Sequence, residues 1–118
     1  MILKTRKKQL KKFKIDKLRE ECGVFGVSDH LDASTLVALG LHALQHRGQE
    51  CCGIVSFDGQ TFHSEKSQGL VGDHFTKDDA IKRLPGSFAI GHNRYSTTGE
   101  TSLRNIQPFF ADLFGGGL

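Results

Sequence analysis

A sharp change in charge at residue 22 divides the chain into two parts of different character. Residues 1–21 hold nine basic and three acidic residues, a net charge of +6, with only a few scattered apolar side chains such as Leu10 and Phe13. Residues 22–118 hold seven basic and ten acidic residues, a net charge of −3. Like charges repel each other, and this small number of apolar side chains cannot form a core. We therefore expect residues 1–21 to be a basic leader, either disordered or a removable propeptide.

The isoelectric point of about 8.9 describes this leader and not the rest of the chain. A basic arm that binds nucleic acid stays open as an alternative, but no RNA-binding signature follows it, and we do not expect nucleic acid as a partner. Three apolar residues at the start are too few for a secretory signal, and no stretch approaches about 18 apolar residues. The sequence therefore predicts no membrane span and a cytoplasmic location.

Three cysteines, with Cys51 and Cys52 adjacent, agree with a reducing compartment. They form no disulfide framework, and neighbouring cysteines lack the spacing of a zinc site. A mixed site with some of the six histidines stays open, although we expect no metal in this chain. Cys51 and Cys52 are predicted to be buried as small apolar residues beside Gly53.

The pattern of residues 22–118 predicts strands alternating with a helix. We expect a strand over 22–28, a helix capped by Asp32 or Ser34, a hairpin of 53–57 and 61–63 around Asp58-Gly59-Gln60, and a strand over 88–95. The helix is predicted to bury the face that carries Leu36, Leu39, Ala43 and Leu44.

Cys22 is the candidate nucleophile. If the leader is cut after Glu21, Cys22 carries both a thiol, with a pKa of about 8.5, and a free α-amine, with a pKa of about 7.7–8.0. The amine then serves as the base that activates the thiol, as in other terminal nucleophiles. His46 and His92 suggest a Cys–His dyad instead, but a terminal amine makes a histidine base unnecessary.

Three segments together resemble one family. Cys22-Gly-Val-Phe-Gly-Val, then Leu44-Gln-His-Arg-Gly-Gln-Glu, then Gly91-His-Asn-Arg-Tyr-Ser-Thr-Thr-Gly are similar to the class II glutamine amidotransferase domain of the amidophosphoribosyltransferase family. The resemblance runs from about residue 20 to 112. It implies an α+β fold, the four-layer α/β/β/α sandwich of N-terminal nucleophile hydrolases, with the cysteine at the start of a central strand.

The resemblance also implies an activity. Cys22 would release ammonia from glutamine, and a second domain would use the ammonia to convert phosphoribosyl pyrophosphate into phosphoribosylamine, the first committed step of purine biosynthesis. Arg94 and Thr97 would bind the α-carboxylate of glutamine, since arginine offers a planar fork of donors and threonine a hydroxyl. Arg47 and Gly48 would shape the wall around the nucleophile.

The chain departs from the family pattern at its end. The His-Asn-Gly-Asn segment that supplies the oxyanion hole, the carboxylate for the α-amine of glutamine and the phosphoribosyltransferase domain are all absent. We therefore expect residues 22–118 to be a truncated domain, inactive alone. Mg²⁺ and the iron–sulfur cluster of some relatives would lie outside it, and the full-length enzyme is expected to be a homo-oligomer. Another class II glutamine amidotransferase and a non-enzymatic fragment stay open.

Overall fold

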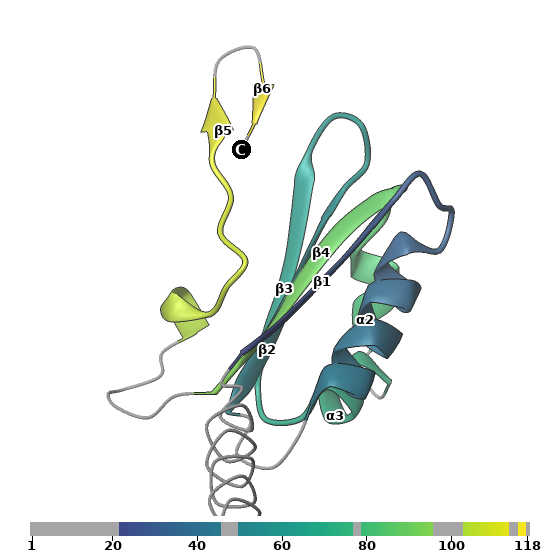
Figure 1. Ribbon diagram of the computed structural model, residues 1–118. Helices are drawn as coiled ribbons and strands as arrows, with labels where there is room; N and C mark the ends of the chain where they lie inside the picture. The colour runs from purple at the N-terminus through teal and green to yellow at the C-terminus, as the bar shows by residue number, and fades with distance from the viewer. Residues whose placement is uncertain (1–21, 46–49, 77–78, 96–102, 114–115, 118) are drawn as a thin grey trace, which may run out of the picture.

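A four-stranded antiparallel sheet forms the centre of the computed structural model, which describes residues 22–45, 50–76, 79–95, 103–113, 116 and 117 (Figure 1). The strands are β1 (Gly23–Ser28), β2 (Cys51–Phe57), β3 (Phe62–Gln68) and β4 (Phe88–Arg94), in the spatial order β1-β4-β2-β3. The strands predicted over 22–28 and 88–95 are confirmed as β1 and β4. The leader, and with it the expected cut after Glu21, lies outside the described residues.

β1 lies at an edge of the described sheet, which differs from the central position that the resemblance implied. It pairs through all six residues with β4, from Gly23 opposite Asn93 to Ser28 opposite Phe88. No described strand pairs with its other side. The backbone groups on that outer side are therefore left without partners from the described strands.

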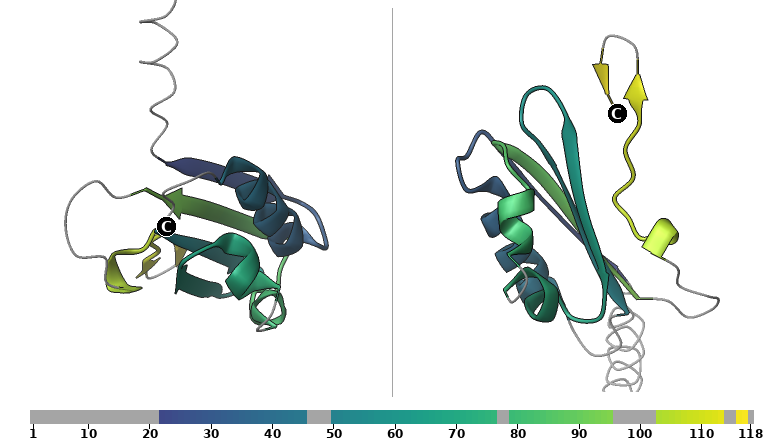
Figure 2. Two further views of the ribbon diagram at one scale, coloured as in Figure 1. Left: turned by 90° about the horizontal axis from the view of Figure 1, so that it is seen from below. Right: turned by 180° about the vertical axis from the view of Figure 1, so that it is seen from behind.

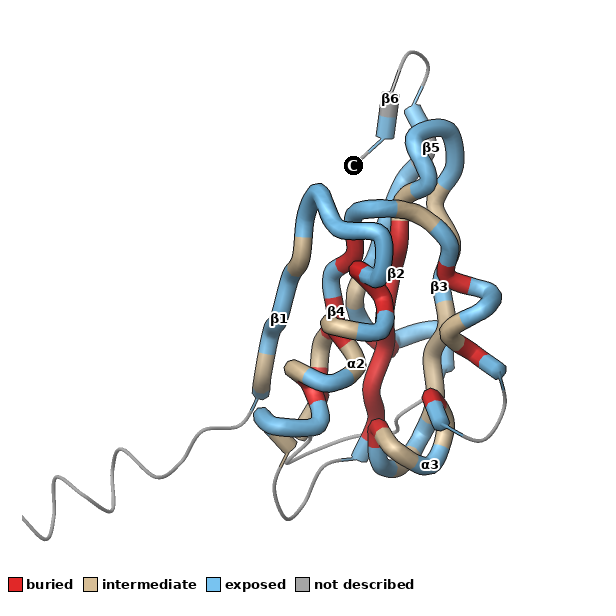
Figure 3. Tube along the Cα trace, turned by 90° about the vertical axis from the view of Figure 1, so that its right-hand side faces the viewer, coloured by how far each residue is buried: buried red, intermediate tan, exposed pale blue. Residues whose placement is uncertain are grey.

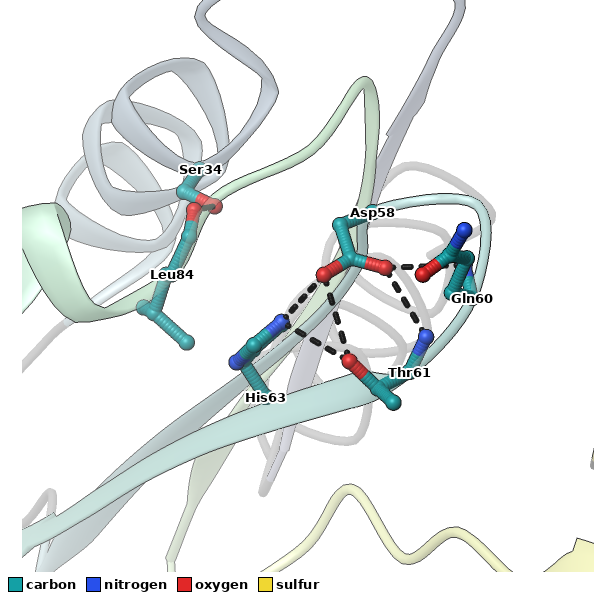
Figure 4. Close-up of polar contacts among 6 residues, drawn as sticks. All are labelled: Ser34, Asp58, Gln60, Thr61, His63 and Leu84. Atoms are coloured by element: carbon teal, nitrogen blue, oxygen red, sulfur yellow. Dashed lines mark hydrogen bonds and ion pairs between the residues drawn. The ribbon is translucent and has the colours of Figure 1, made fainter.

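The predicted hairpin joins β2 to β3, and its strands are longer than expected. Asp58 closes the turn: Oδ1 accepts hydrogen bonds from the backbone N–H groups of Gln60 and Thr61, both at 2.8 Å, and Oδ2 lies 2.8 Å from Nε2 of His63 (Figure 4). Gly59 takes a φ of 99°, in the left-handed region that favours glycine. These contacts lower the pKa of Asp58, and the hydrogen bond with His63 has the largest effect.

The helix α2 (Ala33–Leu44) packs on β4 and β1, but with a different face from the one predicted. Ala33, Val37 and Leu41 are fully buried, whereas Leu39 is 61% exposed. The reason lies on β4, where Gly91 has no side chain: a Cβ atom there would lie 2.6 Å from Cγ1 of Val37, so the helix sits close to the strand.

The predicted helix start is correct in position but not in its capping. α2 begins directly after Asp32, whose side chain makes no capping hydrogen bond. Ser34 lies inside the helix, and its hydroxyl donates a hydrogen bond to the carbonyl oxygen of Leu84 at 2.7 Å (Figure 4). Ser34 therefore fastens α2 to the segment that leads into β4.

Two short helices, which the sequence did not predict, continue this helical layer over β2 and β3 (Figure 2). They are α3 (Val71–Phe75) and the 3₁₀ helix η1 (Ala80–Arg83). Glu65 of β3 joins both, since its carboxylate accepts from Nε of Arg83 at 2.5 Å and lies 3.2 Å from Nε2 of His74. None of the helices in the described part of the chain is long and apolar enough to cross a membrane.

The opposite face of the sheet is covered only in part. The segment that follows the 3₁₀ helix η2 (Leu103–Asn105) runs along β2 and β3 to the short strands β5 (Asp112–Leu113) and β6 (Gly116–Gly117) (Figure 1). On the β1 side Val24 stays 66% exposed, and Figure 3 shows β1 mostly exposed and β2, on the other side of β4, mostly buried. The described residues thus form a helical layer on one sheet, consistent with the incomplete α+β domain that was predicted.

Candidate active site

Cys22 and Arg94 lie at the same end of the sheet. Gly23 pairs with Asn93, and Cys22 directly precedes Gly23, so Cys22 reaches the level of Arg94 on the neighbouring strand. On its other side Arg94 pairs with Cys51 of β2. Directly opposite residues of paired strands point to the same face, so Arg94 and Cys51 share the face that α2 leaves open. The thiol of Cys22 is exposed to solvent.

Arg94 is held by contacts on both its main chain and its side chain. Its carbonyl oxygen accepts a hydrogen bond from the backbone N–H of Glu50 at 3.0 Å, and its Nη1 donates to the carbonyl oxygen of Asn105 at 3.0 Å. A guanidinium has five N–H donors in a fixed fork. One bond to a carbonyl therefore leaves donors for a carboxylate, which arginine binds in bidentate fashion.

The other two cysteines are confirmed to be fully buried. Burial raises the pKa of the Cys51 thiol, an effect that Arg94 opposes and that Glu50 and Cys22 reinforce. Burial, with a smaller contribution from Cys51, raises the pKa of Cys52 to about 12. Thiols react as thiolates, so burial and the raised pKa make both less reactive than an exposed cysteine. Cys22 is therefore the one accessible thiol of the three.

His92 lies two residues before Arg94 on β4, opposite Val24 of β1. Burial lowers the pKa of His92, and the positive charge of Arg94 lowers it further by a smaller amount. The buried Nδ1 atom of His92 has no hydrogen-bond partner among the described residues. The hydrogen bonds of the described residues include none between His92 and Cys22. His46 lies outside the described residues.

Asn93 is a structural residue of the site that sequence reasoning missed. It is fully buried, and its Nδ2 donates a hydrogen bond to the carbonyl oxygen of Leu41 at 2.7 Å. Leu41 belongs to the last turn of α2, where carbonyls lack partners within the helix. Asn93 thus joins the end of α2 to the strand beside Gly23. The available signal was the asparagine itself, a residue that is depleted in strands.

Arg47, Gly48 and Thr97 lie outside the described residues, so their roles stay predictions. The chain on either side of them is described. Glu50, which follows Arg47 and Gly48 in the sequence, donates its backbone N–H to the carbonyl oxygen of Arg94. Thr97 follows Arg94 by three residues. The described residues Glu50 and Arg94, which are close in sequence to Gly48 and Thr97, therefore lie at the sheet end where Cys22 lies.

A helical layer on an antiparallel sheet, with an exposed cysteine at the head of one strand and an arginine at the same sheet end, is consistent with the incomplete N-terminal nucleophile hydrolase domain that was predicted. No family model matches the chain. An amidophosphoribosyltransferase from Rhizobium etli is 64% identical over 103 residues, which make up 87% of this chain and 21% of the relative. The human amidophosphoribosyltransferase is 46% identical over 108 residues, covering 84% of this chain and 21% of the relative.

Solved structures agree with these sequences. The structure described as the allosteric regulatory enzyme of purine biosynthesis matches with a TM-score of 0.71 and 40% identity, over 80% of this chain and 20% of its own. Glutamine phosphoribosylpyrophosphate amidotransferase from B. subtilis matches with a TM-score of 0.68 and 39% identity, over the same shares. The chain is homologous to a segment of the amidophosphoribosyltransferases. It spans about a fifth of the length of the curated relatives it matches.

Proposed function

We propose that this chain carries the nucleophile of a glutamine-hydrolysing site within a longer amidophosphoribosyltransferase. The observation that supports it best is the position of the exposed Cys22 at the same sheet end as Arg94, whose guanidinium keeps donors for a carboxylate. The names of the relatives include glutamine, phosphoribosylpyrophosphate and purine biosynthesis, and they support the proposal. In the proposed reaction, ammonia from glutamine displaces pyrophosphate from phosphoribosyl pyrophosphate and gives phosphoribosylamine, which starts purine biosynthesis.

The chemistry at Cys22 begins with removal of the leader after Glu21. The freed α-amine takes the thiol proton, and the thiolate attacks the side-chain amide carbon of glutamine. The carbon–nitrogen bond breaks, the amine returns its proton to the leaving nitrogen, and ammonia departs from a thioester. Water then attacks the thioester, which releases glutamate and restores the thiol.

Substrate selection in this proposal belongs to Arg94, with Thr97 adding a hydroxyl donor to the same α-carboxylate. Arg47 and Gly48 form the wall beside the nucleophile. Together these groups favour a free amino acid over a glutamine inside a peptide, whose α-carboxylate is consumed in an amide bond. Donors for the oxyanion of the thioester-forming step, each worth about 10²–10³ in rate, come from residues beyond this chain.

The proposal also covers the metal ion and the assembly of the whole enzyme. Among the described residues no group of three or more His, Cys, Asp and Glu side chains is arranged to hold a metal ion. The proposal assigns Mg²⁺ to the phosphoribosyl transfer, with any iron–sulfur cluster also bound by other parts of the enzyme. It places the working enzyme in the cytoplasm as a homo-oligomer.

The test uses a polypeptide of the length of the relatives that contains this chain. Intact-mass spectrometry should show loss of residues 1–21, and a glutamine-analogue electrophile should label Cys22 rather than Cys51 or Cys52. Cys22→Ser should abolish glutamine hydrolysis while phosphoribosylamine still forms from added ammonia. Full glutamine-dependent turnover with residues 1–21 attached would contradict the proposal.

A further inference from the structure

We propose that residues 105–107 are a positioning element that sets the affinity for glutamine by holding the Arg94 side chain, and that Gly53 of β2 is the residue that lets them do so. The inference rests on the proposed function, because it assumes that Arg94 binds the α-carboxylate of glutamine. It assigns a role in substrate binding to residues that do not touch the substrate themselves.

The contact that carries the inference joins Arg94 to the backbone of Asn105. Nη1 of Arg94 donates to the carbonyl oxygen of Asn105 at 3.0 Å, across a separation of 11 residues. Asn105 ends the 3₁₀ helix η2, in which the N–H of Ile106 donates to the carbonyl oxygen of Leu103 at 3.4 Å. Because a carbonyl group in a turn has a fixed direction, it fixes where the guanidinium lies.

Ile106 anchors this turn to the sheet. Its side chain is fully buried, although its neighbours Asn105 and Gln107 are both exposed. This buried side chain fixes the turn to the sheet, ahead of the contacts that Phe109 and Phe110 make with Lys66 and Phe62 of β3. The position of the Asn105 carbonyl therefore depends on how closely Ile106 approaches β2.

Gly53 determines that approach. A Cβ atom at this position would overlap the carbonyl oxygen of Gln107 and would lie 3.1 Å from the carbonyl carbon of Gln107 and 3.3 Å from Cγ2 of Ile106. The first obstacle is backbone, which cannot rotate away as a side chain can. Any side chain at position 53 must therefore push residues 106–107 off the sheet, and the carbonyl of Asn105 must move with them.

The expected consequence is a change in substrate binding and not in chemistry. A guanidinium held in place loses less conformational freedom when it binds a carboxylate. When its anchor moves, the arginine must be ordered by the substrate, so the affinity for glutamine falls. Cys22 does not contact residues 105–107 through any hydrogen bond of the described residues, so its intrinsic reactivity should not change.

The test is Gly53→Ala in the full-length enzyme, with Gly26→Ala as the matched control. Gly26 is also a strand glycine, but its Cβ would meet only Ala89 O at 3.7 Å and Ile90 Cγ1 at 3.8 Å, which are ordinary contacts. Both substitutions reduce the conformational freedom of the unfolded backbone in the same way, so this effect cancels in the comparison. We expect Gly53→Ala to raise KM for glutamine about tenfold with kcat within about twofold, and Gly26→Ala to change neither.

Two further variants keep the result decisive. Ile106→Ala removes the anchor without crowding β2 and should raise KM in the same way, should Gly53→Ala not fold. Arg94→Lys tests the assumption that Arg94 binds the α-carboxylate of glutamine. If this variant leaves KM for glutamine unchanged, the proposed role of Arg94 fails. If Arg94→Lys raises KM while Gly53→Ala and Ile106→Ala do not, the positioning role of residues 105–107 is overturned and the proposed function stands. Alkylation of Cys22 by iodoacetamide should proceed at the same rate in all of them.

Discussion

The side-chain amide of Asn93 donates a hydrogen bond to the carbonyl oxygen of Leu41 at 2.7 Å, and so joins the last turn of α2 to the strand beside Cys22. Asn93→Asp replaces this buried donor by an acceptor-only group that faces a carbonyl. We expect a loss of about 3 kcal/mol in the free energy of unfolding, because a buried charge without a partner is costly. Urea unfolding measures it. Asn105→Asp, at an exposed position, is the control and should change stability by less than about 0.5 kcal/mol.

Gly91→Ala should destabilise the fold by crowding α2. A Cβ atom at Gly91 would lie 2.5 Å from Cδ1 of Leu41 and 2.6 Å from Cγ1 of Val37, both in the buried face of the helix. Overpacking of this kind costs about 1–3 kcal/mol. The shift of the urea midpoint relative to Gly26→Ala isolates the steric effect, and equal midpoints for the two variants would show that α2 does not press on β4.

Stability should fall in acid partly through Glu65. Arg83, and more weakly His74, hold the pKa of Glu65 below its ordinary value, although burial acts in the opposite direction. The folded state therefore binds this proton less readily than the unfolded state. Glu65 contributes stability above about pH 4.3, and the contribution is lost as the pH falls through its lowered pKa.

Glu65→Gln removes that dependence. Between about pH 6 and about pH 3 its free energy of unfolding should fall less than that of the unmodified protein. Asp79→Asn is the control, because Asp79 pairs with Lys82 at 3.5 Å between largely exposed side chains, and such pairs contribute little. Parallel pH profiles for Glu65→Gln and the unmodified protein would rule out this role of Glu65.

The three cysteines should differ sharply in reactivity. In the folded protein at about pH 7.5, iodoacetamide should modify Cys22 first, since it is exposed, while burial protects Cys51 and Cys52 and raises the pKa of each. Peptide mapping after timed labelling gives the three rates. In guanidinium chloride all three should react alike, and protection of Cys51 that persists there would mean that burial is not its cause.

Features that depend on neighbouring residues in the chain could be predicted from the sequence. The hairpin was predicted because Asp58 and Gly59 carry their turn chemistry locally, and the observed hydrogen bonds to Gln60 and Thr61 stay within three residues. The start of α2 directly after Asp32 was also predicted, although Asp32 makes no capping hydrogen bond. The buried face of α2 was not, because that face is chosen by Gly91, a residue of a strand far along the chain.

The same limit applies to the site. Cys22 and Arg94 could be found because their flanking segments form recognisable motifs, and the sheet places them at one end. The bonds of Asn93 to Leu41 and of Arg94 to Asn105 join residues 52 and 11 positions apart. Neither leaves a periodic pattern, since each depends on how closely glycine-bearing strands let another segment approach.

The placement of β1 at the edge of the described sheet bears on the order of events during maturation. Cys22 is exposed at the head of this strand and lies at the surface, not in the packed interior. If the proposed cut after Glu21 takes place, it would therefore need no unfolding of β1 and β4. On that proposal the described sheet can fold first, and Cys22 can gain its free amine afterwards.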